Sequence, residues 1–123
     1  MPTIRIQALT PIEHEISGLL TNCTAAAANA LDIPQDWCWA LFQPVEPGTY
    51  AEGARVWGAT DVGRASVLIS ISALEGRTPE QKAAVLSGTA HSAAEYLGLP
   101  LTQVFADYRD IPKGQVFSGG EIV

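Results

Sequence analysis

The sequence predicts an α/β domain in which two fused β-α-β units form a four-stranded sheet with two helices on one face. The first observation is a repeat, because a shift of 66 residues places residues 31–34 (LDIP) over 97–100 (LGLP) and Gly48 over Gly114. The second is that each half carries, in the same order, an extended stretch, a helix start, an apolar helical stripe and another extended stretch. A strand-helix-strand connection of this kind makes its two strands parallel and places the helix on one face of the sheet.

The first half begins with an alternating stretch at residues 3–8, which is typical of a half-buried strand. Residues 10–13 (TPIE) then form a capping-box pattern that predicts a helix start. Apolar residues recur in the following helix at spacings of three and four, namely Ile16, Leu19, Leu20, Cys23 and Ala27. The helix runs into Pro34, and residues 37–42 (WCWALF) suit a second strand.

The second half repeats this order. Residues 66–71 (SVLISI) are rich in β-branched side chains and predict a strand, and residues 78–81 (TPEQ) predict a capped helix start. The expected buried stripe consists of Leu86, Ala90, Ala93 and Leu97. After Pro100, residues 104–108 (VFADY) predict the last strand.

The chain has the size of one domain. Its 123 residues, of which 47% are hydrophobic and 16% charged, supply one core and leave little for a second. We expect a single domain over residues 1–123, made of a first repeat (1–43), a linker rich in Gly and Pro with room for a short hairpin (44–63) and a second repeat (64–123).

Charge and motifs exclude several classes of function. A net charge of −6 argues against a nucleic-acid or anionic-membrane surface, which needs clustered Lys and Arg. No run is apolar and long enough for a signal sequence or a membrane span, so a cytoplasmic location is expected. Cys23 and Cys38 show no metal-ligand spacing and are expected to be reduced. Nucleotide-binding loops, a nucleophile elbow and zinc spacings are all missing from the sequence.

Several segments resemble the tautomerase superfamily. Pro2 directly follows Met1, and residues 74–82 (LEGRTPEQK) resemble the segment of 4-oxalocrotonate tautomerase that holds its substrate-binding arginine. The likeness extends over residues 67–123 and is looser in the first half. The fused length and the one N-terminal proline are similar to cis-3-chloroacrylic acid dehalogenase and malonate semialdehyde decarboxylase. The resemblance implies a homotrimer.

The resemblance also implies a catalytic group. Methionine is normally removed before a residue as small as proline, which leaves Pro2 as a free secondary amine. An unperturbed α-amino group has a pKa of roughly 8, and burial and a nearby guanidinium both lower it. Pro2 is then the general base that moves a proton in an enol or 2-keto carboxylate, and Arg77 binds the substrate's carboxylate and stabilises developing charge. This chemistry requires no metal and no organic cofactor.

Aromatic residues stand where the short relatives have a second arginine. These are Trp39 and Phe105, and we expect both, together with Phe117, to line the substrate site. Asp107 and Tyr108 lie on the same predicted strand as Phe105 and are weaker candidates for an assisting role. The missing arginine leaves two alternatives open, a hydratase, dehalogenase or decarboxylase of the same superfamily, and a catalytically weak trimer with a structural or binding role.

Overall fold

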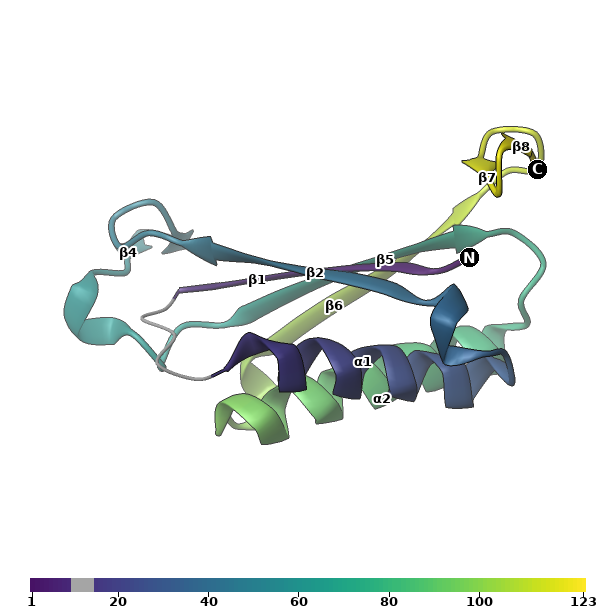
Figure 1. The fold of residues 1–123 in the computed structure, drawn as a ribbon. Helices are drawn as coiled ribbons and strands as arrows, with labels where there is room; N and C mark the ends of the chain where they lie inside the picture. The colour runs from purple at the N-terminus through teal and green to yellow at the C-terminus, as the bar shows by residue number, and fades with distance from the viewer. Residues whose placement is uncertain (10–14) are drawn as a thin grey trace.

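The computed structural model describes residues 1–9 and 15–123, and it has a four-stranded sheet covered on one face by two helices (Figure 1). The predicted fold class is therefore confirmed. The strands of the sheet are β1 (Thr3–Leu9), β2 (Trp39–Val45), β5 (Val67–Leu74) and β6 (Val104–Ile111), in the order β2-β1-β5-β6. The helices are α1 (Ile16–Leu31) and α2 (Pro79–Leu97).

The sheet consists of two parallel pairs joined at an antiparallel centre. β1 runs parallel to β2 and β5 runs parallel to β6, as each β-α-β crossover requires. β1 and β5 are antiparallel, with Ile4 opposite Ile71 and Ile6 opposite Ile69. The two units are thus related by an approximate two-fold rotation, and corresponding features of the two repeats lie at opposite ends of the sheet.

A short 3-10 turn precedes the second strand of each unit, and in the first unit it moves the start of that strand. η1 (Gln35–Trp37) and η3 (Leu101–Gln103) follow the two prolines that stop the helices. The Trp37 N–H donates to the Pro34 carbonyl at 3.1 Å, so Trp37 belongs to a turn and β2 begins two residues later than predicted. β2 also continues to Val45, so the first two residues of the predicted linker are part of the sheet.

The helix start of the second repeat is the predicted capping box. The Thr78 hydroxyl accepts from the Gln81 N–H at 3.1 Å, and the Gln81 side-chain carbonyl accepts from the Thr78 N–H at 2.9 Å. The corresponding pattern predicted at residues 10–13 lies outside the described residues. In the described part, α1 follows Glu15, whose side chain makes no capping hydrogen bond.

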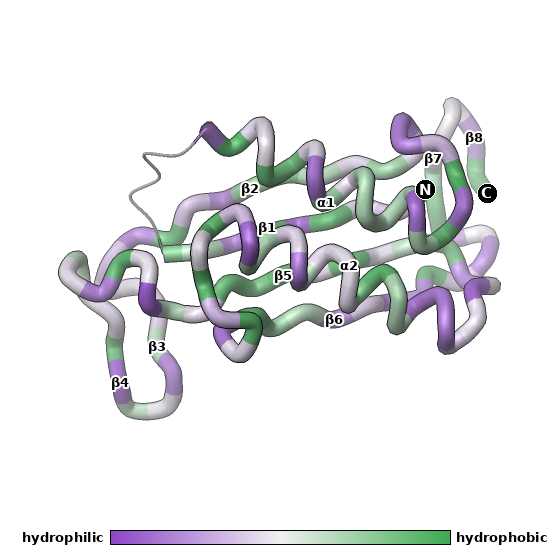
Figure 2. The backbone as a smooth tube through the Cα atoms, turned by 90° about the horizontal axis from the view of Figure 1, so that it is seen from below, coloured by the Kyte–Doolittle hydropathy of each residue, from purple (hydrophilic) through white to green (hydrophobic). Residues whose placement is uncertain are grey.

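The core lies between the helices and one face of the sheet. Figure 2, seen from the helix side, shows hydrophobic residues recurring along both helices and along the strands behind them. The stripe predicted for α1 is confirmed: Leu19, Cys23 and Ala27 are fully buried, and Ile16 and Leu20 are partly buried against the core. The stripe of α2 is centred on Val85, Thr89 and Ala93. Of the other predicted positions, Leu86 and Leu97 are partly buried against the core, and Ala90 is partly buried. The apolar pattern missed Thr89 because this residue is polar; its hydroxyl donates to the Val85 carbonyl at 2.8 Å.

Each unit ends in a small two-stranded hairpin. The first, β3 (Ala51–Glu52) with β4 (Arg55–Val56), is followed by a 3-10 turn, η2 (Ala59–Asp61), in the segment predicted as a linker; the second is β7 (Phe117–Ser118) with β8 (Glu121–Ile122). Figure 1 shows the hairpins at opposite ends of the sheet, with β7–β8 at the end where the chain begins. One end of the sheet therefore gathers the N-terminus, the C-terminal hairpin and the start of α2.

Candidate functional site

Pro2 lies at the start of β1 with its ring buried. The Trp39 N–H donates to the Pro2 carbonyl at 3.0 Å, which extends the ladder between β1 and β2 by one residue. Continuing both registers of β1 places Pro2 between Cys38 and Ala73, on the face of the sheet that the helices cover. The Pro2 side chain is less than 2% exposed, and Met1 before it is partly exposed. The N-terminal segment is thus held at a fixed place at the edge of the core.

Arg77 lies in the connection between β5 and α2, one residue before the helix cap. Gly76, at φ +120°, provides a backbone conformation that residues with a side chain rarely adopt, and this bend brings Arg77 back over the end of β5. The guanidinium is partly buried, and its Nη1 donates to the Leu74 carbonyl at 3.4 Å. Within residues 1–9 and 15–123, Arg77 forms no ion pair, so its charge is available to a ligand.

Strand register and one hydrogen bond place Pro2 and Arg77 at the same end of the sheet. Continuing the antiparallel register of β1 and β5 places Pro2 opposite Ala73, and Arg77 donates to the carbonyl of Leu74, the next residue of β5. Cys38, directly before β2, is the register neighbour of Pro2 on the other side. Burial raises the pKa of its thiol, while the positive charges of the N-terminus and of Arg77 act to lower it.

A second group of polar side chains lies next to Arg77 on β6 and α2. Lys82 forms an ion pair with Asp110, and its Nζ lies 5.8 Å from the centre of the Tyr108 ring. Burial raises the pKa of Tyr108; Arg77 and Lys82 act to lower it and Asp110 to raise it. Neither Lys82 nor Asp110 was singled out from the sequence. The alternation of β6 could have indicated Asp110, because Tyr108 and Asp110 are two residues apart and share the helix-covered face. The position of Lys82 depends on how α2 lies over β6.

The three aromatic residues predicted to line the site do not meet Pro2 within one chain. Trp39, Phe105 and Phe117 are 57%, 64% and 71% exposed. Trp39 is the cross-strand partner of Thr3, so it lies on the opposite face of the sheet from Pro2. Phe105 is on β6, at the other edge of the sheet, and Phe117 is on the C-terminal hairpin.

The uncovered face of the sheet carries large apolar side chains. Trp39 and Leu41 on β2 and Phe105 on β6 are all exposed there, and they lie beside shallow hollows. The hollow next to Phe105 is also lined by Asp107 and Arg109, which form an ion pair at 3.2 Å. Water-exposed aromatic and aliphatic groups gathered on one face are typical of a surface that contacts another protein chain.

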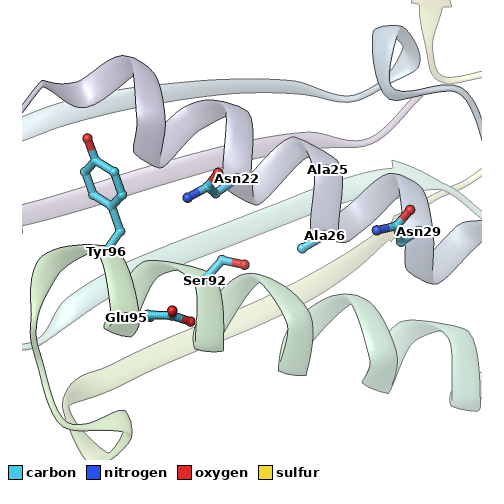
Figure 3. A pocket seen from close by; sticks show the side chains of 7 residues that line it. All are labelled: Asn22, Ala25, Ala26, Asn29, Ser92, Glu95 and Tyr96. Atoms are coloured by element: carbon cyan, nitrogen blue, oxygen red, sulfur yellow. The ribbon is translucent and has the colours of Figure 1, made fainter.

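A larger hollow, of about 600 Å³, lies between the outer sides of the two helices (Figure 3). Its lining side chains are small or polar: Asn22, Ala25, Ala26, Asn29, Ser92, Glu95 and Tyr96. None of them is among the residues that surround Pro2 or Arg77. This groove is therefore separate from the candidate site and offers no paired base and cation.

Residues 1–9 and 15–123 contain no cluster of three or more His, Cys, Asp or Glu side chains placed to hold a metal ion. In the same part of the chain, neither helix has the length and apolar character needed to cross a membrane.

Comparison with known sequences gives two matches. A family model described as tautomerase enzyme matches residues 68–123. A protein of Lactococcus lactis subsp. lactis (strain IL1403), described as probable tautomerase LL0574, is 32% identical over 54 residues, which make up 44% of this chain and 88% of the relative. The family model thus matches the second β-α-β unit and its hairpin.

Solved structures show the same fold over nearly the whole chain. Pt0534 inactivated by 2-oxo-3-pentynoate matches with a TM-score of 0.87 and 21% identity, covering 98% of this chain and 94% of the other. Native fused 4-OT matches with a TM-score of 0.85 and 22% identity over the same shares. A protein named N1, a member of the cis-3-chloroacrylic acid dehalogenase family, matches with a TM-score of 0.83 and 17% identity, covering 98% and 82%.

Proposed function

The chain belongs to the tautomerase superfamily, and on this basis we propose that it is a cofactor-independent tautomerase that moves a proton within an enol or 2-keto carboxylate. Pro2 is the general base once Met1 has been removed, and Arg77 anchors the substrate's anionic group. One observation carries the proposal: strand register places Pro2 opposite Ala73, and Arg77 donates to the carbonyl of the adjacent Leu74, which supports a base and a cation at the same end of the sheet.

The surroundings of Pro2 favour an uncharged amine. The ring is buried against the core, and a guanidinium without an ionic partner in the described chain lies nearby. Burial and a neighbouring positive charge both disfavour an ammonium ion. A neutral secondary amine can take a proton from an enol hydroxyl, or from the carbon next to a carbonyl, and return it elsewhere on the conjugated system.

Arg77 supplies the complementary charge. Its planar fork of N–H donors matches a carboxylate or a 2-keto carboxylate, and the same donors stabilise the negative charge that develops as the proton leaves. The rigid β5 strand and the capped start of α2 fix the backbone on either side of the residue. The substrate is therefore expected to be a small molecule with a carboxylate close to the reacting carbon.

We also propose that the chain forms a homotrimer in which the uncovered sheet faces meet. Trp39, Leu41 and Phe105, which are exposed in the single chain, would then be covered by a neighbouring subunit. In that position, Trp39, Phe105 and Phe117 can form walls of the neighbouring subunit's pocket. Fused 4-OT, whose fold this chain shares, has been solved as a trimer. Sedimentation equilibrium tests this proposal, with a mass three times that of the chain expected.

One alternative activity has support of its own. The likeness to N1 keeps a dehalogenase, hydratase or decarboxylase as the second candidate, with the same amine and arginine acting on a 3-haloacrylate or a related acid. Halide or semialdehyde release from such acids, in the absence of ketonisation, would identify it. A trimer that binds anions without turnover is the candidate from another class, and both assays would then stay at background.

The proposal is tested by intact mass and ultraviolet ketonisation assays with phenylenolpyruvate and 2-hydroxymuconate. We expect a mass without Met1, activity in the wild type, and large losses in Pro2→Ala and Arg77→Ala. The matched control is Arg64→Ala, which removes an exposed arginine from the other end of the sheet and should leave the rate unchanged. Retained methionine, or equal rates in all four proteins, would exclude this site.

A further inference from the structure

The hydroxyl of Tyr108 is a buried polar group beside the arginine of the proposed site. Within the described residues, this oxygen is closed off from solvent and has no hydrogen-bond partner. Buried polar atoms are nearly always paired in folded proteins, so an unpaired one requires an explanation. Tyr108 is also not part of the chemistry assigned to Pro2 and Arg77.

The nearest charged neighbours of Tyr108 on its own strand and on α2 already satisfy each other. Lys82 and Asp110 form an ion pair, and Lys82 contacts the tyrosine through the face of the ring rather than through the hydroxyl. The ring itself packs against the core on the helix-covered face. The aromatic part of Tyr108 is thus fixed in position, and its oxygen is left without a partner.

Arg77 is the remaining charged group near the hydroxyl. Asp110, two residues after Tyr108 on the same face of β6, pairs with Ala73 of β5, and Arg77 donates to the carbonyl of the next residue, Leu74. The positive charge of Arg77 also acts to lower the pKa of Tyr108. The side chain makes one described hydrogen bond, to the Leu74 carbonyl at 3.4 Å, which is at the long limit for such a bond. Most of the five N–H donors of the guanidinium are therefore free.

We propose that Tyr108 is a positioning residue for Arg77, whose guanidinium donates to the tyrosine hydroxyl when an anionic ligand binds beside Pro2. The hydrogen bond fixes the plane of the fork, so that the remaining donors face the ligand. Because burial raises the pKa of Tyr108, the hydroxyl stays protonated and neutral and adds no charge to the site. This inference rests on the proposed function of the same site, and the tyrosine itself does not touch the substrate.

The test compares Tyr108→Phe with Tyr96→Phe. The control removes a hydroxyl that donates to the Glu15 carbonyl in the groove between the helices. Losing a hydrogen bond to a charged group should raise KM for phenylenolpyruvate roughly tenfold in Tyr108→Phe. We expect kcat to fall by a smaller factor than KM rises, because Arg77 also stabilises developing charge while the amine stays intact. The carboxylate-free enol of phenylacetaldehyde should be affected much less than phenylenolpyruvate. Tyr96→Phe should keep the wild-type KM.

The melting temperature distinguishes a role of Tyr108 in positioning Arg77 from a role in stabilising the fold. Because the Tyr108 hydroxyl is unpaired in the free protein, Tyr108→Phe should melt at or above the wild-type temperature, whereas Tyr96→Phe should melt lower. In an Arg77→Ala background, Tyr108→Phe should have no further effect on KM. An unchanged KM in the single variant, an equal loss with the neutral enol, or an undiminished effect without Arg77 would overturn the inference.

Calorimetric titration with phenylpyruvate measures anion binding without turnover, so it shows whether the positioning role or the proposed activity is wrong. If no variant turns over substrate, but the wild type binds the anion about tenfold more tightly than Tyr108→Phe, then the proposed activity is wrong and the positioning role stands. If the wild type is active and Arg77→Ala weakens binding, but Tyr108→Phe binds like the wild type, then only the positioning role is wrong.

Discussion

The two ends of the sheet are built alike but carry different chemistry. In each unit, a 3-10 turn leads into the outer strand at one end of the sheet, and a small hairpin follows that strand at the other end. Gly48 and Gly114 have φ values of 86° and 89°, and their N–H groups donate to the carbonyls of Trp57 and Val123 at 2.8 and 2.9 Å. The backbone of one repeat is thus reproduced in the other, even in these details.

The side chains at the two ends differ where a reaction would occur. The buried isoleucines of β1 correspond to those of β5 at a spacing of 65, which makes Val67 the counterpart of Pro2. Val67 follows Ser66 within the chain, so its nitrogen is an amide and cannot act as a base. Duplicating the backbone therefore duplicates the scaffold but not the amine, and one chain can hold at most one site of this kind.

The largest expected effect comes from inserting one residue before Pro2, so that Pro2 is no longer N-terminal. A serine inserted between Met1 and Pro2 makes the Pro2 nitrogen an amide after methionine removal, so ketonisation should fall by roughly 10²–10⁴-fold, the usual contribution of a general base. A serine inserted between Gly63 and Arg64, before the strand that begins at Val67, should leave the rate unchanged. Initial rates on phenylenolpyruvate measure both, and equal losses in the two proteins would show that the ends do not differ in function.

Equivalent core positions should respond equally in stability. Ile6 and Ile71 are both fully buried, one on each central strand. Replacing either by alanine should cost about 2–5 kcal/mol, because each change removes buried methyl groups and leaves a cavity. Urea unfolding measures both variants. If the two losses in unfolding free energy differ by more than the width of this range of about 2–5 kcal/mol, the two halves of the core are not equivalent.

The middle of α1 has a titratable side chain, Cys23, and the middle of α2 has a threonine at the same position. Burial raises the pKa of Cys23 from 9.0 to about 11, whereas its counterpart in α2, Thr89, does not titrate. Since the unfolded chain loses this proton at lower pH than the folded one, stability is intact below about pH 9 and should fall by about 2–3 kcal/mol as the pH rises to 11. Denaturant unfolding at several pH values measures the slope. Cys23→Thr, which copies the second helix, should make the slope clearly smaller, and the remainder comes from Cys38 and Tyr108, whose pKa values are also raised. An undiminished slope in this variant would contradict the assignment to Cys23.

The smallest effect is expected at the paired turns before the hairpins. Alanine at Gly48 or at Gly114 would force a residue with a side chain to adopt a positive φ, which costs about 1–2 kcal/mol. A Cβ atom at either position would meet no neighbouring atom within 4 Å, so strain rather than a clash sets the cost. Thermal melting should therefore place the two variants close together, and a large gap would mean that one turn has a contact the other lacks.

Local patterns predicted most of the fold but only part of the site. The capping box at Thr78 and the stripe of α1 follow from spacing along the chain, and the structure confirms both. The stripe of α2 was predicted incompletely: Leu86, Ala93 and Leu97 pack in the core, but Thr89 was missed because it is polar, and its hydroxyl is satisfied by a hydrogen bond within its own helix. Cys38 and Lys82 were missed as neighbours of the site because their positions depend on strand register and on how α2 lies over β6, which no short motif encodes.

The proposed roles of Pro2 and Arg77 can be tested together by treating the protein with 2-oxo-3-pentynoate, the 2-keto acid that inactivates Pt0534, and mapping the modified peptide by mass spectrometry. Its activated triple bond reacts with a neutral amine, and its carboxylate fits Arg77. We predict a chain without Met1 that carries one adduct on Pro2, formed much more slowly in Arg77→Ala. A retained Met1, or an inactivated protein whose Pro2 is unmodified, would contradict both roles.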